Sequence, residues 1–514
     1  MNDSDSSMPL SRQLCYQKQC RENWKENALK KQEKIREYVQ SNRALKKSRD
    51  CWKARAKEAE QKIKDLEKQL AQFSPSPDLS SANCDENDEE SEIIPHHHYR
   101  ISTISVVVQQ FIKVGNSFRG AAKTMQLISS HSQLDTPHYS SVKNWMEKIG
   151  LFELLRPKQR RDDWLFIVDL TIELGKSKAL VIYGISYQDW QLHNLRNRSS
   201  LKPTDGQILA LEVTTEATGA WIYGILESVS QSVGIPLQII ADRASNLRKG
   251  IQLFQDRHQK VIYTYDVTHA MANLLKKELF GSECFQNFLA DCHSCRLHVQ
   301  QTELAFAAPP AQRSQCRYFN LDRLVNWSLR MFQCDLTFLA RLLPNLSFPQ
   351  FLARWQQKFS WLEDYYEPIC FWRSLLFLTR TLEKQLKSFG LHQASLLHYS
   401  QKLSLHKISH FTLPFKQKIF SYLQEQILPC FDHTFLATSD VLESLFGRYK
   451  YFSQRCPIKE LRSLLLTIPL STVNFNHEFV KEALTTVHVS DLSQWIQHTF
   501  GQSNLSKRKL LFGH

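Results

Sequence analysis

The chain has 514 residues and a formal net charge of +14, with 65 Lys and Arg against 51 Asp and Glu. Its length allows two or three domains, and its charge favours a polyanionic partner, for which nucleic acid is preferred over an anionic membrane surface. No run of about 18 apolar residues is present to span a membrane, and the N-terminus has no apolar signal core, so we expect an intracellular protein.

Residues 1–17 are expected to be disordered, and residues 18–73 are rich in Lys, Glu, Gln, Arg and Ala with almost no Gly or Pro. Apolar residues follow a heptad pattern over the last three repeats, at Leu45, Trp52, Ala59, Leu66 and Phe73 and at Ala56, Ile63 and Leu70. We therefore predict a basic coiled coil that dimerises, lies on phosphate backbone, or does both. A solvated charged helix is the alternative.

Residues 74–100 combine Ser, Pro and an acidic run, which predicts an acidic flexible linker. Residues 101–155 then show three short helical patterns, the first ended by Gly115 and the third opened by Thr136-Pro137. This arrangement is typical of a helix-turn-helix DNA-binding domain, with a structural three-helix connector as the alternative. In the first interpretation, the major groove receives the exposed side chains of the third helix, which are His138, Ser140, Ser141, Lys143 and Asn144.

Residues 156–270 contain three apolar runs that each lead into an acid, at Asp169, Asp242 and Asp266. Two further strand candidates lie at 179–187 and 206–215, and helical patterns lie at 218–233 and 244–254. The resulting order, strand, strand, strand, helix, strand, helix, strand, is the ribonuclease H order. It predicts an α/β core with Asp169 on the central first strand and Asp242 beside it.

Two carboxylates held close together repel one another unless a divalent metal ion lies between them, so this pair suits Mg²⁺ or Mn²⁺. A third carboxylate from a later helix normally completes such a site. The segment that follows Thr438-Ser439-Asp440 has a helical pattern and carries Glu443 and, two turns later on the same face, Lys450. The glutamate is placed to ligate metal, and the lysine to reach a phosphate.

The region between these parts, residues 271–430, is mostly helical in pattern, rich in aromatics and poor in glycine. Because a ribonuclease H core needs far fewer residues than this, we predict an all-α insertion domain there. The closing helix and C-terminal helices occupy 431–500, and 501–514 form a basic tail. Within the insertion, the residues that invite a zinc interpretation are Cys284, Cys292, Cys295 and His298. They lack a clean second Cys pair, so ordinary helix residues are preferred.

In these features the chain resembles a DDE transposase of the kind encoded by bacterial insertion sequences. The stretches that carry the resemblance are VDLTIELGKSKALVIYG, GIPLQIIADRASNLRKGI, YTYDVTHAMANLLKKEL and SDVLESLFGRYK. The Glu443 and Lys450 pair looks like the end of a signature in one large group of these enzymes, although the Arg that precedes the glutamate there is absent. Asp266-x-x-His269 is similar to a motif of hAT-type transposases, which also carry a helical insertion.

The resemblance implies metal-dependent DNA cleavage and strand transfer at the ends of a mobile element. Two Mg²⁺ ions, with Mn²⁺ as a substitute, would be bridged by Asp169 and held singly by Asp242 and Glu443. Asp266 and His269 would support this set, with Asp266 as the alternative second aspartate. Side chains that would hold DNA phosphates are Lys450, Arg243 and Lys249, for which a solvated face is the alternative.

The implied partners are double-stranded DNA, as terminal inverted repeats and as target, and further copies of the chain in a homo-oligomer on DNA. The implied location is the bacterial cytoplasm, at the nucleoid. A catalytically inactive, transposase-derived DNA-binding protein is one alternative, which the intact acids disfavour. A nuclease unrelated to transposition would share the metal site, and a structural coiled-coil protein would have no use for the sheet and its acids.

Overall fold

The computed structural model describes residues 32, 50, 93–129, 135–172, 177–311, 318, 320–406, 410–431, 433–455 and 461–513. The predicted disordered N-terminus, the coiled coil and most of the acidic linker therefore lie outside the described residues. The chain divides into two units, Met1–Asp85 and Glu86–His514. None of the helices in the described ranges combines the length and the apolar character that a membrane crossing requires.

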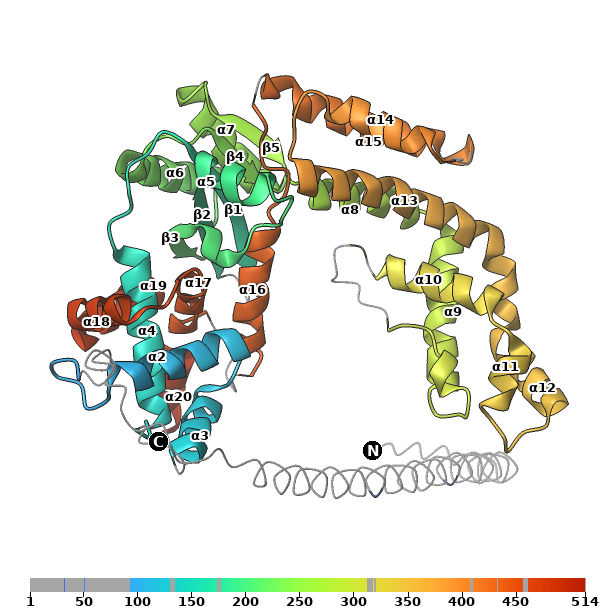
Figure 1. Cartoon of the computed structure of the whole chain (residues 1–514), viewed down its shortest axis with the longest axis horizontal. Helices are drawn as coiled ribbons and strands as arrows, with labels where there is room; N and C mark the ends of the chain where they lie inside the picture. The colour runs from blue at the N-terminus through green and yellow to red at the C-terminus, as the bar shows by residue number, and fades with distance from the viewer. Residues whose placement is uncertain are drawn as a thin grey trace, which may run out of the picture. The chain divides into compact units, whose positions relative to one another are not determined.

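The α/β part of the second unit is built on a five-stranded mixed sheet (Figure 1). Its strands are β1 (Trp164–Ile172), β2 (Lys178–Ser186), β3 (Gln207–Thr214), β4 (Gln238–Ala241) and β5 (Ile262–Tyr265). They lie in the order β3-β2-β1-β4-β5, with β2 antiparallel to both neighbours and β4 and β5 parallel to β1. The predicted strands are confirmed, and the sheet is compatible with a ribonuclease H-like core.

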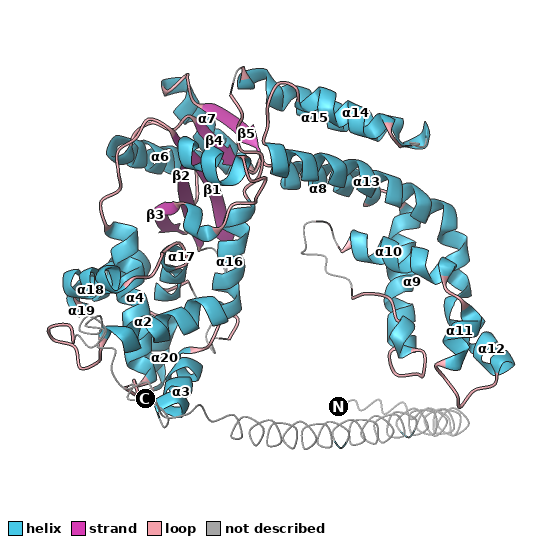
Figure 2. Ribbon diagram, viewed as in Figure 1, coloured by secondary structure: helices cyan, strands magenta, loops and turns pink. Residues whose placement is uncertain are grey.

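Helices account for most of the remaining chain (Figure 2). The α-helices in chain order are α2 (Ile101–Gln109), α3 (Phe118–Ser129), α4 (Tyr139–Leu155), α5 (Tyr187–Asp189), α6 (Gly219–Val233), α7 (Ser245–Arg257), α8 (Val267–Leu279), α9 (Glu283–Val299), α10 (Leu321–Gln333), α11 (Leu336–Arg341), α12 (Phe348–Phe359), α13 (Tyr366–Phe389), α14 (Ser395–Ser404), α15 (Leu413–Ile427), α16 (Asp440–Ser453), α17 (Thr467–Leu470), α18 (His477–Thr486), α19 (Val489–Phe500) and α20 (Asn504–Phe512). The shorter π and 3-10 elements are η2 (Gln110–Val114), η3 (Trp190–Leu195), η4 (Pro203–Asp205), η5 (Ala305–Ala307), η6 (Ser360–Tyr365), η7 (His410–Thr412), η8 (Leu428–Cys430) and η9 (Ser463–Leu466).

Helices cover both faces of the sheet, which is why its strands read as continuous apolar runs rather than alternating ones. On one face, Phe166 and Val168 of β1 belong to a core with α6 and α7. On the other face, Leu165 and Ile167 belong to a larger core that contains residues of α8, α13 and α16. The closing helix α16 therefore packs on the face opposite to α6 and α7.

The region between β5 and α16 is predominantly helical, as predicted, and runs from α8 to α15. Within it, α10 and α11 are separate helices, because the Asp335 carboxylate caps α11 by accepting from the backbone N–H groups of Thr337 and Phe338. Cys292 and Cys295 are buried in α9. Burial raises the pKa of the Cys292 thiol above its ordinary value.

Helices α2, α3 and α4 confirm the helical pattern of 101–155, and Gly115 ends the first with a left-handed φ of 79°. They do not form a separate body, because α4 is buried in a core shared with residues of η9, α18 and α19. At Gly150 of α4 an added Cβ would lie 2.5 Å from the carbonyl oxygen of Leu466. The predicted division between 101–155 and the C-terminal helices therefore runs through one continuous core.

Both ends of this region also differ from the expected linker and tail. An antiparallel bridge joins Ile93 to Arg100, and Ile94 is buried in the same core as α4. The last part of the predicted linker is thus packed structure. At the other end, residues 504–512 form α20, none of whose side chains is buried.

Gln238, a fully buried residue of β4, holds the segment by which the chain returns from the helical insertion to the sheet. Its amide nitrogen donates to the hydroxyl of Thr264 at 2.6 Å and to the carbonyl of Leu436 at 2.7 Å. Its amide oxygen accepts from the backbone N–H of Leu436 at 3.0 Å. One side chain therefore joins β4, β5 and the segment that leads into α16.

We expect Gln238→Met to lower the free energy of unfolding by about 2–4 kcal/mol, because it leaves the backbone groups of Leu436 buried without a partner. Denaturant titration measures this change. The matched control is Gln252→Met, which removes an exposed amide on α7 and should change stability by less than about 0.5 kcal/mol. Equal losses in the two variants would contradict the assigned role of Gln238.

Candidate active site

Three neighbouring strands each lead into an aspartate at the same edge of the sheet. The residues paired across this row are Val168 of β1, Ala241 of β4 and Tyr265 of β5. The next residues along the chain are Asp169, Asp242 and Asp266. Because β1, β4 and β5 are parallel and in register, these aspartates form a row, with Asp169 on the central strand and Asp242 beside it as the sequence predicts.

Alternation along β1 decides which face Asp169 occupies. Leu165 and Ile167 belong to the core that contains the buried side of α16, so Asp169 lies on the same face. Helix α16 contacts β1 directly, and Figure 1 shows it running alongside that strand. The face that carries Asp169 is therefore the face covered by the closing helix.

The Asp169 and Asp242 side chains are half-buried and are held by short local bonds. Oδ1 of Asp169 accepts from the N–H of Leu170 at 2.7 Å. Oδ1 of Asp242 accepts from the N–H of Ala244 at 3.0 Å, just before α7 begins. The Tyr263 hydroxyl donates to the Asp242 carbonyl at 2.9 Å and fixes the backbone there. Both carboxylates thus stand at positions set by the sheet.

Asp266 is fully buried and joins two helix starts. One carboxylate oxygen accepts from the backbone N–H of His269 at 2.6 Å, which caps α8, and lies 3.3 Å from Nδ1 of the same residue. The other accepts from the N–H and the hydroxyl of Ser439 at 2.5 and 3.0 Å. Ser439 is the residue before α16, so Asp266 holds the closing helix to the sheet. This geometry favours the supporting role over that of the alternative second aspartate.

A buried ion-pair network continues from the start of α16 into the helical insertion. Nζ of Lys387 on α13 lies 2.5 Å from Asp440 and 2.6 Å from Glu383. The Glu383 carboxylate also accepts from Arg380 at 2.7 Å and from the Tyr318 hydroxyl at 3.0 Å. The first residue of α16 is therefore tied to α13.

The charges in this network control one another. Burial by itself would raise the pKa of Glu383, but Lys387 and Arg380 hold that pKa below its ordinary value. Burial by itself would lower the pKa of Lys387, but Glu383 and Asp440 raise it. Each group is thus kept ionised by its partners, and the network acts as a set of fixed charges.

Glu443 and Lys450 both lie on the exposed side of α16, seven residues apart. The opposite side of this helix is buried and includes Leu442, Leu445 and Tyr449. Among the described residues, no group of three His, Cys, Asp or Glu side chains is close enough to hold one metal ion. The backbone therefore places Asp169 and Asp242 on adjacent strands, and these two residues and Glu443 do not form a group of three that could hold one metal ion.

The other residues expected at phosphates are exposed near the start of α7. Arg243, one residue after Asp242, forms an ion pair with Glu425 of α15 and lies over the ring of Tyr265, 4.8 Å from its centroid. Lys249 is exposed on α7, and the aliphatic part of its side chain lies beside Gly219 at the start of α6. Arg243 is thus adjacent to the row of aspartates, with its charge engaged by α15.

The predicted DNA-reading face lies at the start of α4. His138, Ser140 and Lys143 are exposed, whereas Ser141 and Asn144 are half-buried. Nδ1 of His138 accepts from the N–H of Ser140 at 3.4 Å, as an N-cap does. Beyond Asn144 the helix is buried, so only its first turns are available to a partner.

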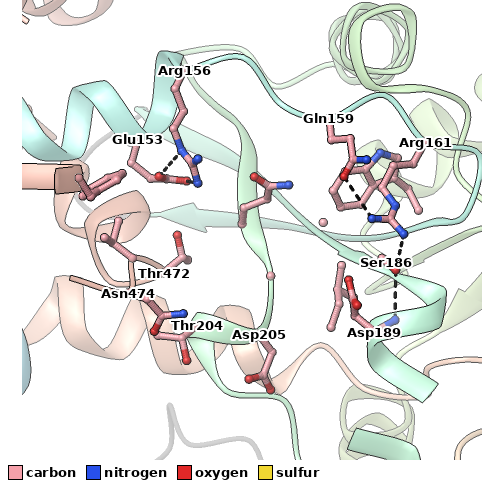
Figure 3. A pocket seen from close by; sticks show the side chains of 17 residues that line it. Glu153, Arg156, Gln159, Arg161, Ser186, Asp189, Thr204, Asp205, Thr472 and Asn474 are labelled. Carbon is pink, nitrogen blue, oxygen red and sulfur yellow. Dashed lines mark hydrogen bonds and ion pairs between the residues drawn. The ribbon is translucent and has the colours of Figure 1, made fainter. Parts of the chain in front are cut away.

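A polar cavity of 340 Å³ lies at the other end of β1 (Figure 3). Its buried carboxylate, Glu153, accepts from Arg156 at 2.5 Å and from Lys158 at 2.8 Å. Arg161 bonds Asp163 at 2.7 Å and the hydroxyl of Ser186 at 3.0 Å. Glu153 and Arg161 are therefore paired with opposite charges of the chain itself. These pairs join the end of α4 to the sheet at this cavity.

Two buried charged residues went unpredicted from the sequence, Glu383 on α13 and Lys148 on α4. Each interrupts an otherwise apolar helical stripe: Glu383 lies next to Leu382, and Lys148 lies between Met146 and Ile149. A charge at a core position of a helix is costly unless it is paired or used. That interruption was the available signal.

We expect Lys387→Met to lower the free energy of unfolding by about 2–4 kcal/mol, because it leaves the buried Glu383 carboxylate short of a counter-charge. Lys384→Met, an exposed position one turn earlier on α13, is the matched control and should change stability by less than about 0.5 kcal/mol. Thermal and denaturant unfolding of both proteins measure the difference. A Lys387→Met protein as stable as this control would show that the network does not hold α13 to α16.

Comparison with solved structures shows a weak likeness to a transposase complex. No protein-family model matches the chain, and no curated protein matches it. A solved structure described as the Drosophila P element transposase strand transfer complex aligns with 84% of this chain and 100% of its own chain, at 12% sequence identity and a TM-score of 0.36. At these values the likeness by itself establishes neither fold nor activity.

Proposed function

We propose that this protein is a DDE-type transposase, which binds the ends of a mobile DNA element and catalyses metal-dependent DNA cleavage and strand transfer. The observation that carries the proposal is the pair Asp169 and Asp242, which follow the paired residues Val168 and Ala241 on adjacent parallel strands. The strands and helices around this pair follow each other along the chain in the order predicted for a ribonuclease H-like nuclease core. The sheet order β3-β2-β1-β4-β5 places β1 at the centre with β4 beside it, as predicted.

The chemistry of the two aspartates suits magnesium. Mg²⁺ in proteins is held by one or two carboxylates together with water and the phosphate oxygens of a substrate. In the proposal Asp169, Asp242 and Glu443 of α16 would hold two Mg²⁺ ions, with Mn²⁺ as a substitute. When bound, the ions supply a nucleophilic water or 3′ hydroxyl and neutralise charge on the phosphodiester.

The surrounding residues position the acids and the DNA in this proposal. Asp266, with His269, fixes the start of α16 relative to the sheet and so sets where Glu443 lies. Lys450 holds a backbone phosphate as a point charge on the same side of α16. Arg243 and Lys249 hold further phosphates near the start of α7.

DNA recognition is assigned to the 101–155 helices, read as a helix-turn-helix. His138, Ser140, Ser141, Lys143 and Asn144 would contact the terminal inverted repeats in the major groove. The net charge of +14 favours binding to both repeat and target duplexes. The predicted coiled coil would join copies of the chain into a homo-oligomer on the DNA, and a bacterial, nucleoid-associated location would follow.

A second candidate is a catalytically inactive, transposase-derived DNA-binding protein. The observation that favours it is that Glu443 does not join Asp169 and Asp242 in one group within the described part of the chain. Both candidates bind DNA, and only the first cleaves it. Cleavage of DNA taken from the region that flanks the gene therefore separates them.

We expect Asp169→Ala, Asp242→Ala and Glu443→Ala each to reduce cleavage of element-end DNA at least roughly 100-fold while DNA binding is retained. Loss of a metal ligand removes charge neutralisation and nucleophile activation together, a larger effect than loss of the residues that orient ligands. The measurement is single-turnover cleavage in Mg²⁺, with electrophoretic mobility shift for binding.

The matched control is Asp256→Ala, which removes an exposed carboxylate on α7 and should leave cleavage unchanged. Full activity of the Asp242→Ala protein together with loss in a folded Asp266→Ala protein would assign the second ligand to Asp266. Absence of cleavage by the unaltered chain, with DNA binding intact, would support the inactive candidate.

We expect Lys450→Ala to slow cleavage less than Glu443→Ala does, because a point charge on phosphate positions the strand without activating the nucleophile. Replacing Mg²⁺ by Mn²⁺ should not restore the rate, since no metal ligand is missing. Single-turnover cleavage of a pre-bound DNA end is the measurement. An unchanged rate would place Lys450 on the solvated side of α16 with no role in the reaction.

A further inference from the structure

A second cavity, of 570 Å³, lies between the start of α4 and the C-terminal helices. Its walls come from three places in the sequence: the turn that precedes α2, one stripe of α4, and the junction of α18 with α19. The stripe of α4 contains Ser141, Asn144, Trp145 and Lys148, whose spacing puts them on one side of the helix. Ser141 and Asn144 belong to the predicted DNA-reading face.

The cavity is lined by one positively charged side chain that has no hydrogen-bonded partner among the described residues. Lys148 is only 5% exposed and lines the cavity. Its ammonium makes no hydrogen bond and no close ion pair with any described residue; Asp491 at the start of α19 is the carboxylate whose charge reaches it. That carboxylate accepts from the N–H of His488 at 2.7 Å. Burial lowers the pKa of Lys148, and the Asp491 carboxylate offsets part of this effect.

The rest of the lining combines histidine side chains with apolar side chains, which include Trp145, Leu484 and Val489. The turn at one side places His96, His97 and His98 at the cavity, and its residue His96 has a left-handed φ of 64°. The other side is the N-terminus of α19, a helix of 12 residues, at His488 and Val489. A helix N-terminus carries a partial positive charge, and at this one the Asp491 carboxylate already accepts from the N–H of His488.

A cation is a poor match for this lining. No three His, Cys, Asp or Glu side chains come close enough for one metal ion within the described ranges, and the ammonium of Lys148 would repel it. An apolar ligand would leave that ammonium buried and unpaired, which is costly. An anion with several acceptor oxygens satisfies Lys148, the Ser141 hydroxyl and the Asn144 amide together.

We propose that this cavity is a phosphate-binding site that takes a backbone phosphate of the DNA bound along the first turns of α4. The assignment of the phosphate to DNA rests on the proposed function, whereas the affinity for phosphate rests on the lining alone. The site would anchor the DNA backbone beside the base-reading residues, and it would make the buried lysine a phosphate ligand rather than a defect of the core.

The first test is thermal unfolding of the full-length protein with inorganic phosphate against chloride at constant ionic strength and pH. Phosphate at about four times its Kd should raise the Tm of the unaltered protein by roughly 1 °C, because a ligand that binds only the folded state stabilises it. Lys148→Met should abolish this rise, and its Tm in chloride should equal or exceed that of the unaltered protein, because an unpaired buried charge is gone.

Two further proteins make this test specific. Lys260→Met removes an exposed lysine in the turn before β5 and should keep the full phosphate effect. Lys148→Arg retains the charge and should keep part of it. A phosphate effect that persists in Lys148→Met, or that is lost equally in Lys260→Met, would overturn the site.

The second test is duplex DNA binding by the full-length protein at several salt concentrations. Loss of one phosphate contact should reduce the slope of log K against log salt by about 0.9 in Lys148→Met and leave it unchanged in Lys260→Met. A lost phosphate effect with an unchanged DNA slope would overturn DNA as the source of the phosphate. Absence of DNA binding by the unaltered protein would refute the proposed function while the phosphate result stands independently.

Discussion

The structure depends on how the chain rejoins its sheet after the helical insertion. Strand β5 ends at Tyr265, and α16 begins only at Asp440. Two buried side chains close this long excursion: Gln238 bonds both backbone groups of Leu436, and Asp266 bonds the backbone and hydroxyl of Ser439. Because each of these bonds is buried, an alternative docking of α16 would leave polar groups without partners, which is costly.

This arrangement links the insertion to the candidate active site. Asp266 lies in the same row as Asp169 and Asp242, and its two carboxylate oxygens accept hydrogen bonds from the starts of α8 and α16. Asp440, the residue directly after Ser439, forms an ion pair with Lys387 of α13. The helix that carries Glu443 is therefore positioned from two sides, by the sheet and by the insertion. A change in the position of α13 would first displace the beginning of α16, where Asp440 lies.

The part of the protein that we propose to bind DNA also depends on a core shared between distant segments. Helix α4 has a polar start and a buried remainder, and the buried remainder packs with η9, α18 and α19. The first turns of α4 are thereby held at a fixed position relative to the α19 N-terminus. This is why residues as distant in sequence as His97, Lys148 and His488 line one cavity. A separate three-helix module would not have formed it.

Local pattern in the sequence determined the strands, their order and the placement of the acids, because buried strands are apolar runs and each here leads directly into Asp169, Asp242 or Asp266. It also determined that the insertion is helical and that Glu443 and Lys450 lie on the same exposed side of one helix. The tertiary structure alone decided that Asp266 is a structural anchor, that α4 shares a core with the C-terminal helices, and that Asp169, Asp242 and Glu443 do not form one metal-binding group. It also decided that Lys148 is buried without a direct ion-pair partner among the described residues. These features depend on contacts between segments far apart in the chain, and the period of a single strand or helix carries no information about which distant segment it will meet.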